Sequence, residues 1–169
     1  HEEHKRIVRD AIRRQIEILV YIPCSNTLRI LLNRCLYNQE TTLQNKLLVL
    51  VNQPQSFFGI SLRLQSPTEW KEVINQLQMI NRKALPQDRL AILLSVANNI
   101  PKLFLLEHSH DEKPLGADEF LPIFIYVVVK ARISSLLALK EQLQYFCDPE
   151  TRISEIGYYI ATLEASVHH

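Results

Sequence analysis

The sequence predicts an all-α fold: a single layered bundle of seven or eight helices, formed by residues 1–169 as one domain. The chain has 169 residues and is 47% apolar, which suits one ordinary domain with one core. It contains only 3 glycines, whereas sheet proteins consume glycine in their turns. Apolar residues recur at helical spacing from end to end, and no segment makes a convincing strand.

Proline and hydroxyl side chains divide the first half into three predicted helices. Pro23 is expected to end the first helix, because the residue before a proline leaves the α region. Ser25 is then expected to cap the second helix, and Thr41 or Thr42 to start a third that ends before Pro54. The apolar positions of the first helix are Ile7, Ala11, Ile12, Ile16, Leu19 and Val20.

The clearest helix start lies after a short apolar segment, residues 57–60, which we expect to be a packed connector. Ser66 is the predicted cap, Pro67 fits the first helical position, and Glu69 can reach back to the Ser66 amide. The predicted buried face of this helix consists of Trp70, Val73, Ile74, Leu77 and Ile80.

The second half contains the most apolar helix of the chain. Pro86 is expected to open a helix that Pro101 kinks or splits. Residues 107–116 are the most polar stretch and the predicted exposed loop. The helix 120–129 is apolar nearly all round, so we expect it at the centre of the bundle, with two amphipathic helices after it at about 134–146 and 152–167. The predicted core residues of helix 120–129 are Leu121, Phe124, Ile125, Val128 and Val129.

Charge and hydropathy exclude several functions. The formal net charge is +1, so no basic excess exists to bind a nucleic-acid backbone. No apolar run approaches the ~20 residues of a membrane span, so direct membrane insertion is not expected. Cys24, Cys35 and Cys147 are predicted to be buried, reduced thiols of a cytosolic protein. The chain lacks an initiator Met, so we expect a fragment of a longer protein; His168 and His169 are either native or a tag remnant.

Few side chains suggest chemistry. His108, His110 and Asp111 could hold a surface ion, but two histidines on a loop do not make a closed site, so no metal or cofactor is expected. No nucleophile motif or phosphate loop occurs, so covalent catalysis is not expected. Asp118 stands between the polar loop and the most apolar helix. Its position alone favours an N-cap, although a capping residue can also be presented to a partner.

The segment 116–126, GADEFLPIFIY, closely resembles the signature of the vacuolar-protein-sorting-nine domain. That family consists of guanine-nucleotide exchange factors for early-endosomal Rab GTPases, the Rab-five group. Gly157-Tyr158-Tyr159 resembles the terminal-helix motif of the family, and the resemblance covers about residues 40–167. The sequence departs from the family pattern at Ala161, where the family often has Thr and this chain has Thr162 one place later, and at Pro101.

The resemblance implies a catalyst of GDP release from an early-endosomal Rab, with no cofactor and no covalent chemistry. Asp118 matches the acidic finger and Tyr158 the switch-region contact, whereas Pro122, Tyr159 and Thr162 are candidate GTPase-binding residues. The implied protein is a cytoplasmic monomer, associated peripherally with endosomal membranes through other regions or partners.

Three other interpretations remain open at this point: an exchange-inactive module that binds a Rab or another endosomal protein, a helical scaffold unrelated to GTPases, and an ordinary enzyme, for which no set of convergent groups is apparent.

Overall fold

The computed structural model describes residues 2–108 and 114–146, and all regular structure in these ranges is helical. The α-helices are α1 Glu2–Ile16, α2 Ile22–Cys35, α3 Tyr37–Leu50, α4 Lys71–Gln78, α5 Pro86–Glu107, α6 Ala117–Ala131 and α7 Leu136–Phe146. The predicted all-α class is confirmed. A π-helical turn, Glu17–Tyr21, joins α1 and α2 into one rod, so the described part holds slightly fewer separate helices than the seven or eight predicted. The helix predicted at 152–167 lies outside the described residues.

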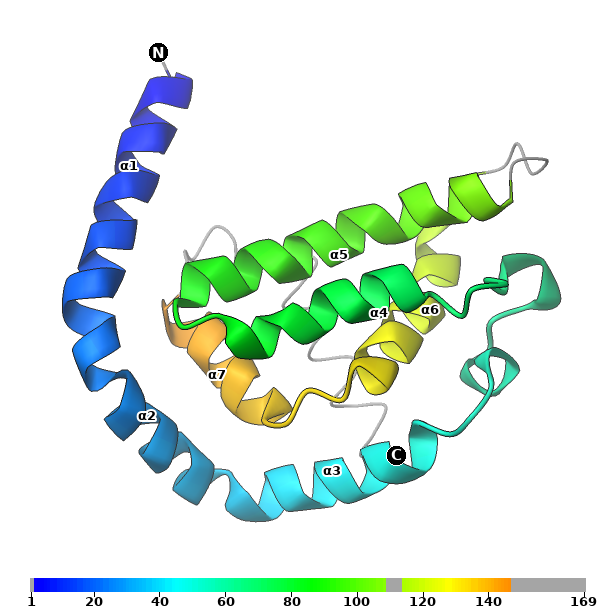
Figure 1. Ribbon diagram of the computed structural model, residues 1–169, viewed down its shortest axis with the longest axis horizontal. Coiled ribbons are helices and arrows are strands. Elements are labelled where there is room, and N and C mark those ends of the chain that lie inside the picture. Colours follow the sequence, from blue (N-terminus) through cyan, green and yellow to red (C-terminus); the bar gives the residue numbers. More distant parts are fainter. Residues whose placement is uncertain (1, 109–113, 147–169) are drawn as a thin grey trace.

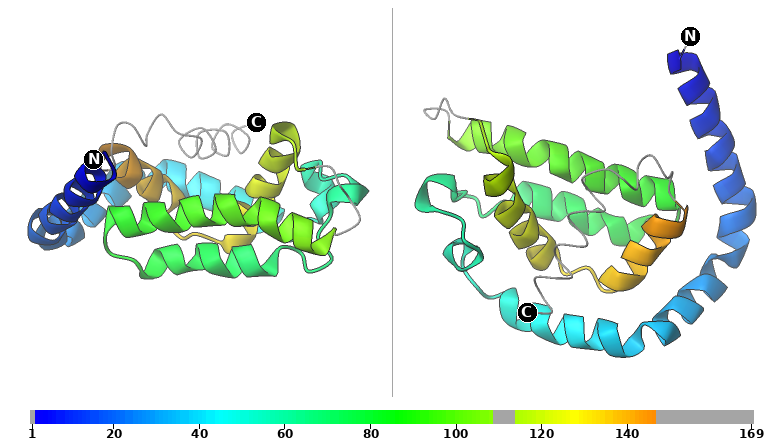
Figure 2. Two further views of the ribbon diagram at one scale, coloured as in Figure 1. Left: turned by 90° about the horizontal axis from the view of Figure 1, so that it is seen from above. Right: turned by 180° about the vertical axis from the view of Figure 1, so that it is seen from behind.

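The helices form a compact bundle and a long curved arm. Helices α1, α2 and α3 follow one another along the edge of the bundle, and α4 to α7 make up the bundle itself (Figure 1). Within it α4 packs against α5 and α6, and α5 packs against α6 and α7. The view from behind shows the same arm curving around the same edge (Figure 2). The arm therefore frames the bundle, and its second end leads back through short 3₁₀ turns into α4.

Helix α6 lies at the centre of the core, as predicted. Ile123, Phe124 and Val127 are completely buried, and the apolar side chains of α3, α4, α5 and α7 pack in the same cluster. The ring of Phe58, from the connector, meets the ring of Tyr126 edge-on at 5.3 Å. Burial raises the pKa of Tyr126 to about 12. Leu121 and Ile125, also predicted as core, are only partly buried; Ile125 packs against the outside of the cluster.

The predicted capping box before α4 is only partly correct. The Ser66 hydroxyl oxygen does accept hydrogen bonds from the amides of Thr68 and Trp70, at 3.2 and 3.1 Å. However, Glu69 and Trp70 adopt positive φ angles of 54° and 59°, so the helix begins only at Lys71. The Ser66 amide donates to the buried side chain of Gln55 instead of Glu69. The same Gln55 oxygen also accepts from the indole nitrogen of Trp70 at 2.9 Å, which ties the connector to the core.

The structure corrects the prediction for Pro23 and one of the two alternatives predicted for Pro101, a split helix. Pro23 does not end the first helix; the π-helical turn ends at Tyr21, two residues before it, and the wider turn leaves room for the proline ring. Ser25 consequently lies inside the rod, where its hydroxyl donates to the Ile22 carbonyl, and it caps nothing. Pro101 does not split α5, because Ile100 and Phe104, both completely buried, hold the helix against the core on either side. Pro86 opens α5 as predicted.

The third helix and two of the cysteines also differ from the prediction. Helix α3 begins at Tyr37, so the hydroxyls of Thr41 and Thr42 lie within it and donate to carbonyls one turn back. Cys24 and Cys35 are exposed, not buried, because α2 presents no buried residue to the bundle. The third cysteine, Cys147, lies outside the described residues.

The first part of the arm, α1 and the π-helical turn, meets the start of α5 and the end of α7. Arg14 forms an ion pair with Asp88 of α5, with Nη1 and Oδ1 2.6 Å apart. Next to this pair Glu17 is buried; its Oε2 accepts a long hydrogen bond of 3.4 Å from the Gln87 amide, and its Oε1 has no hydrogen-bond partner in the described part of the chain. Tyr21 packs edge-on against Phe146 at 5.0 Å. The contacts of Arg14, Glu17 and Tyr21 form a clasp between the arm and the bundle. The apolar residues of α1 that precede this clasp are exposed, so the amphipathic helix predicted there forms without burying its apolar face.

Helix α5 has the length and mean hydropathy, 1.4, of a membrane-spanning helix. Its other features are those of a core helix. Val96, Ile100 and Phe104 are completely buried against the bundle, and its first turn carries the Asp88 ion pair to the arm. The core helix of a soluble protein can have the same length and mean hydropathy as a membrane-spanning helix, so we interpret α5 as part of the bundle core.

Candidate functional site

The first turn of α6 holds the candidate site. Gly116, with φ −72° and ψ 159°, takes the N-cap position, and its carbonyl accepts from the Phe120 amide at 2.9 Å. Asp118 is therefore the second residue of the helix, and the interpretation of Asp118 as the N-cap is wrong. The cause lies one residue further on: the Glu119 carboxylate reaches back and accepts from the Gly116 amide at 2.9 Å, which is half of a capping box.

A glycine at position 116 suits this arrangement. A Cβ atom on Gly116 would stand 3.3 Å from the Oε2 atom of Glu119, closer than most real contacts of that kind. The missing side chain thus lets the carboxylate approach the backbone closely. The reciprocal bond of a full capping box, from a side chain of the N-cap residue, cannot form because glycine has none.

Asp118 is exposed, and no hydrogen bond or ion pair of its side chain occurs among the described residues. The free backbone amides of a first helical turn make acidic side chains favourable there. Two residues further on, Phe120 is buried and stacks on Phe124 with ring centroids 5.8 Å apart. Asp118 is thus an unengaged acid on a turn that the core holds firmly.

Pro122 lies one helical turn after Asp118, so the two residues share a face of α6. A proline inside a helix has no amide hydrogen to donate, so the Asp118 carbonyl lacks its usual partner four residues on. Pro122 is half-buried and leaves part of its ring accessible beside Asp118. The structure therefore brings together these two of the predicted site residues.

The remaining predicted site residues, Tyr158, Tyr159 and Thr162, lie outside the described residues, as does Ala161. His110 and Asp111 of the considered metal site also lie outside them. His108 is described: its ring stacks on Phe104, and its two nitrogens face the carbonyl oxygens of Phe104 and Gln65. No group of three metal-ligating side chains occurs within residues 2–108 and 114–146.

Sequence reasoning missed two residues that hold the first turn of α6 in place, Glu119 and Arg63. Glu119 accepts from the Gly116 amide through one oxygen, and its other oxygen lies 2.5 Å from Nη2 of Arg63. Arg63 belongs to the 3₁₀ turn Leu62–Leu64, which lies in the longer connector that runs from α3 to α4. The Gly-x-x-Glu spacing is a capping signal that could have identified Glu119. No local signal could have identified Arg63, because the two residues are 56 positions apart in sequence.

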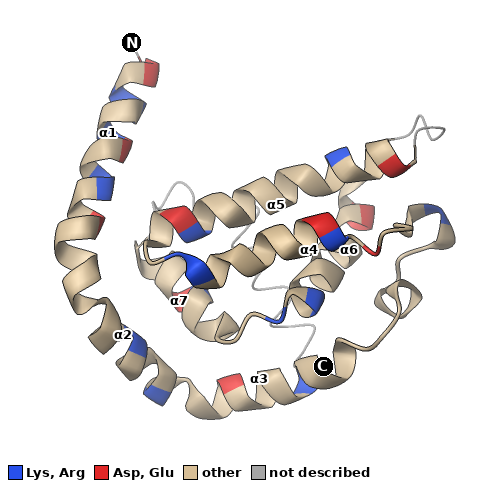
Figure 3. Ribbon diagram, viewed as in Figure 1, with Lys and Arg blue, Asp and Glu red and all other residues tan. Residues whose placement is uncertain are grey.

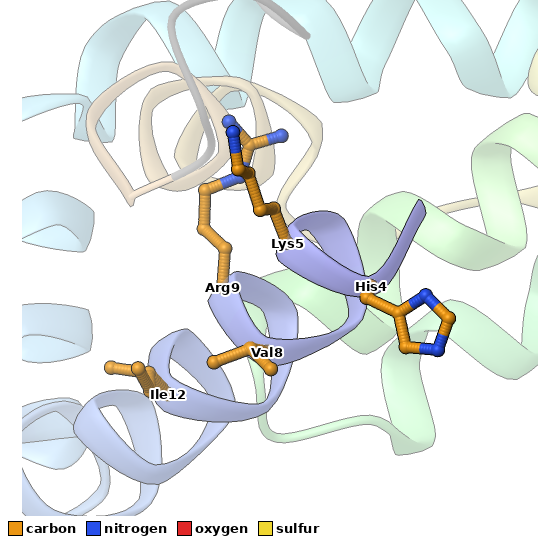
Figure 4. A pocket seen from close by; sticks show the side chains of 5 residues that line it. All are labelled: His4, Lys5, Val8, Arg9 and Ile12. Carbon is orange, nitrogen blue, oxygen red and sulfur yellow. The ribbon is translucent and has the colours of Figure 1, made fainter. Parts of the chain in front are cut away.

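A groove along α1 of the arm lacks the features of a catalytic site. This groove, of about 810 Å³, is lined by His4, Lys5, Val8, Arg9 and Ile12 of α1 (Figure 4). Its charged groups are all basic, and the helix side chains around it are exposed. Over the described residues, basic and acidic segments are interspersed along the arm and the bundle (Figure 3). The groove along α1 offers no set of convergent acids and bases.

Comparison with known proteins identifies relatives of the chain. The model of the Vacuolar sorting protein 9 (VPS9) domain matches residues 70–169. Human Ras and Rab interactor 3 is 23% identical over 161 residues, which is 91% of this chain and 16% of the relative. Vacuolar protein sorting-associated protein 9A from rice, Oryza sativa subsp. japonica, is 35% identical over 100 residues, 59% of this chain and 21% of the relative.

A third relative, human Ras and Rab interactor 1, is 30% identical over 110 residues, 65% of this chain and 14% of the relative. The chain thus spans about a fifth or less of the length of these relatives. The family match begins at the buried Trp70 and includes all of α4 to α7, the four helices of the bundle. Because the match covers more than half of the chain, this protein belongs to the Vacuolar sorting protein 9 (VPS9) domain family.

Proposed function

We propose that this domain is a guanine-nucleotide exchange factor that promotes GDP release from a Rab GTPase, and that its substrate belongs to the early-endosomal, Rab-five group. Two relatives are named Ras and Rab interactor 1 and Ras and Rab interactor 3, which connects them with Rab proteins. The observation that carries the proposal is the exposed carboxylate of Asp118, which has no partner among the described residues and stands at the start of the most buried helix.

The chemistry of GDP binding explains why such an acid would act. A GTPase holds GDP through a magnesium ion and a lysine that contact the phosphates. Magnesium requires oxygen ligands in strict octahedral geometry. A carboxylate placed at this site would repel the β-phosphate, offer the lysine another partner and disturb the metal coordination. Each effect weakens nucleotide binding, and no covalent bond is made or broken.

The proposal also needs a surface that grips the GTPase. Switch segments are ordered partly by nucleotide and magnesium, so a surface that binds them in another conformation favours the nucleotide-free state. We propose that Pro122 contributes to this surface beside Asp118, and that Tyr158, Tyr159 and Thr162 contribute to it from the C-terminal segment. We further propose that the protein acts as a monomer in the cytoplasm, and that other regions or partners associate it peripherally with endosomal membranes.

The test is release of fluorescent GDP from a panel of purified Rab proteins. We expect this domain to accelerate release from an early-endosomal Rab, and Asp118→Ala to lower the rate by roughly a hundredfold or more, as for the loss of a key electrostatic group. Asp10→Ala removes an exposed aspartate of α1 and serves as the matched control with the parent rate.

Equal rates for Asp118→Ala and the parent would exclude the acidic finger. The second candidate function is an exchange-inactive Rab-binding module, which Ala161 favours because the family often has a threonine there. Capture of nucleotide-free Rab without faster GDP release would support that second function.

A further inference from the structure

The Glu119 carboxylate joins two elements at the start of α6. Its Oε2 atom accepts from the Gly116 amide at 2.9 Å, and its Oε1 atom lies 2.5 Å from Nη2 of Arg63. Gly116 immediately precedes the helix, whereas Arg63 belongs to the connector between α3 and α4. A single carboxylate therefore fixes the turn that carries Asp118 to a distant part of the chain.

Arg63 is held on a rigid support. The next residue, Leu64, is buried in the core, and its amide donates to the Ser61 carbonyl at 2.8 Å. On the other side of the turn, the Gln65 side-chain amide donates to the Ile60 carbonyl at 3.2 Å. Because the backbone around Arg63 is anchored in this way, its guanidinium can fix the position of the Glu119 carboxylate on α6.

The ion pair contributes little to folding. The side chains of Arg63 and Glu119 are 39% and 28% exposed, and partly solvated pairs of this kind add little to global stability. The pair does contribute geometry. With one oxygen on Arg63, the Glu119 carboxylate loses its rotational freedom, and its second oxygen stays on the Gly116 amide.

We propose that Arg63 and Glu119 are positioning residues for exchange: they fix the first turn of α6 so that the Asp118 carboxylate is presented in one orientation. The inference rests on the proposed exchange function. Arg63 acts through Glu119 and makes no contact with the nucleotide in this mechanism. It also neutralises Glu119, so that Asp118 is the acid of the pair that remains available to a partner.

The test compares the kinetics of GDP release for Arg63→Ala, Glu119→Gln and the double variant. Arg63→Ala is expected to lower kcat by roughly ten- to a hundredfold with little change in KM, since misplacement of a reacting group by about 1 Å has effects of this size. The double variant should be no slower than the slower single variant, because each of the two substitutions removes the same Arg63–Glu119 ion pair. Arg34→Ala, an exposed arginine of α2, is the matched control.

Two further measurements separate positioning from a structural role. In the Asp118→Ala background, Arg63→Ala should cause no additional loss of kcat. The hydrogen-exchange rate of the Gly116 amide, followed by NMR without any GTPase, should rise in Arg63→Ala and in Glu119→Gln while Tm stays at the parent value.

A rise in KM at constant kcat would overturn the proposal, because it would indicate that Arg63 contacts the GTPase directly. Parent kinetics or an unchanged Gly116 amide in Arg63→Ala would overturn it as well, and would leave the proposed exchange function intact. A parent domain that accelerates no Rab would instead refute the exchange function, and the positioning role with it.

Discussion

Asp118 and Glu119 are adjacent acids with different surroundings. Asp118 projects from the first turn of α6, whereas Glu119 turns back onto Gly116 and Arg63. Position in the sequence was sufficient to place Asp118 at the junction of loop and core. It could not assign the cap, because the choice between two neighbouring carboxylates depends on which one finds a partner. That partner, Arg63, is 56 residues away.

The burial of the Glu17 carboxylate costs folding free energy, and the sequence does not reveal this cost. Its carboxylate is buried beside Gln87, and Oε1 has no hydrogen-bond partner among residues 2–108 and 114–146. Burial raises the pKa of Glu17, with Asp88 adding to the effect and the Gln87 amide, Arg13 and Arg14 opposing it. A carboxyl group whose folded pKa is raised binds more protons in the folded state. The free energy of unfolding therefore falls as pH rises above the unfolded pKa of about 4.5.

This linkage gives a prediction for Glu17→Gln. The substitution removes the buried charge, so it should increase the free energy of unfolding by about 1 kcal/mol at about pH 7.5, the cost of an unsatisfied buried group. At about pH 4 the parent carboxyl is protonated, and the difference should largely disappear. Urea denaturation at both pH values measures it. An equal difference at the two pH values would contradict the assignment of the cost to ionisation.

At the scale of elements, proline is a reliable signal only where the tertiary structure agrees with it. Pro86 opens α5 as its missing amide hydrogen favours. Pro23 and Pro101 lie within continuous helical stretches, the first behind a π-helical turn and the second between two buried side chains. The local rule gives the cost of a proline in a helix. Whether a helix bears that cost depends on packing that the local sequence does not contain.

The connector before α4 depends on Ser66. Its hydroxyl accepts from two amides and its backbone pairs with the side chain of Gln55. Ser66→Ala should therefore lower the free energy of unfolding by about 1 kcal/mol, the usual cost of losing a capping hydroxyl. Ser56→Ala, at an exposed serine of the preceding 3₁₀ turn, should change it by less than about 0.5 kcal/mol. Equal losses in chemical denaturation would contradict the capping role.

At the scale of the whole molecule, α1 and the bundle contribute unequally to stability. No residue of α1 is buried, and α1 with the π-helical turn after it meets α5 and α7 through Arg14, Glu17 and Tyr21. Deletion of residues 1–12 should therefore lower the free energy of unfolding by less than about 1 kcal/mol, a shift of a few degrees in Tm. Deletion of residues 1–21 removes the clasp as well and should cost more. Calorimetry of the two truncations tests this, and a large loss from the shorter deletion would contradict it.

The sequence by itself determined the fold class, the central position of α6 and the exposed acid at its start. These follow from local chemistry: scarce glycine, apolar residues at helical spacing, and a polar loop directly before an apolar helix. The tertiary structure alone decided that α1 leaves its apolar face exposed, that Cys24 and Cys35 are exposed, that Glu17 is buried, and that Arg63 holds Glu119. Burial and ion pairs between distant segments depend on which surfaces meet, and periodicity states only that a surface is apolar, without naming its partner.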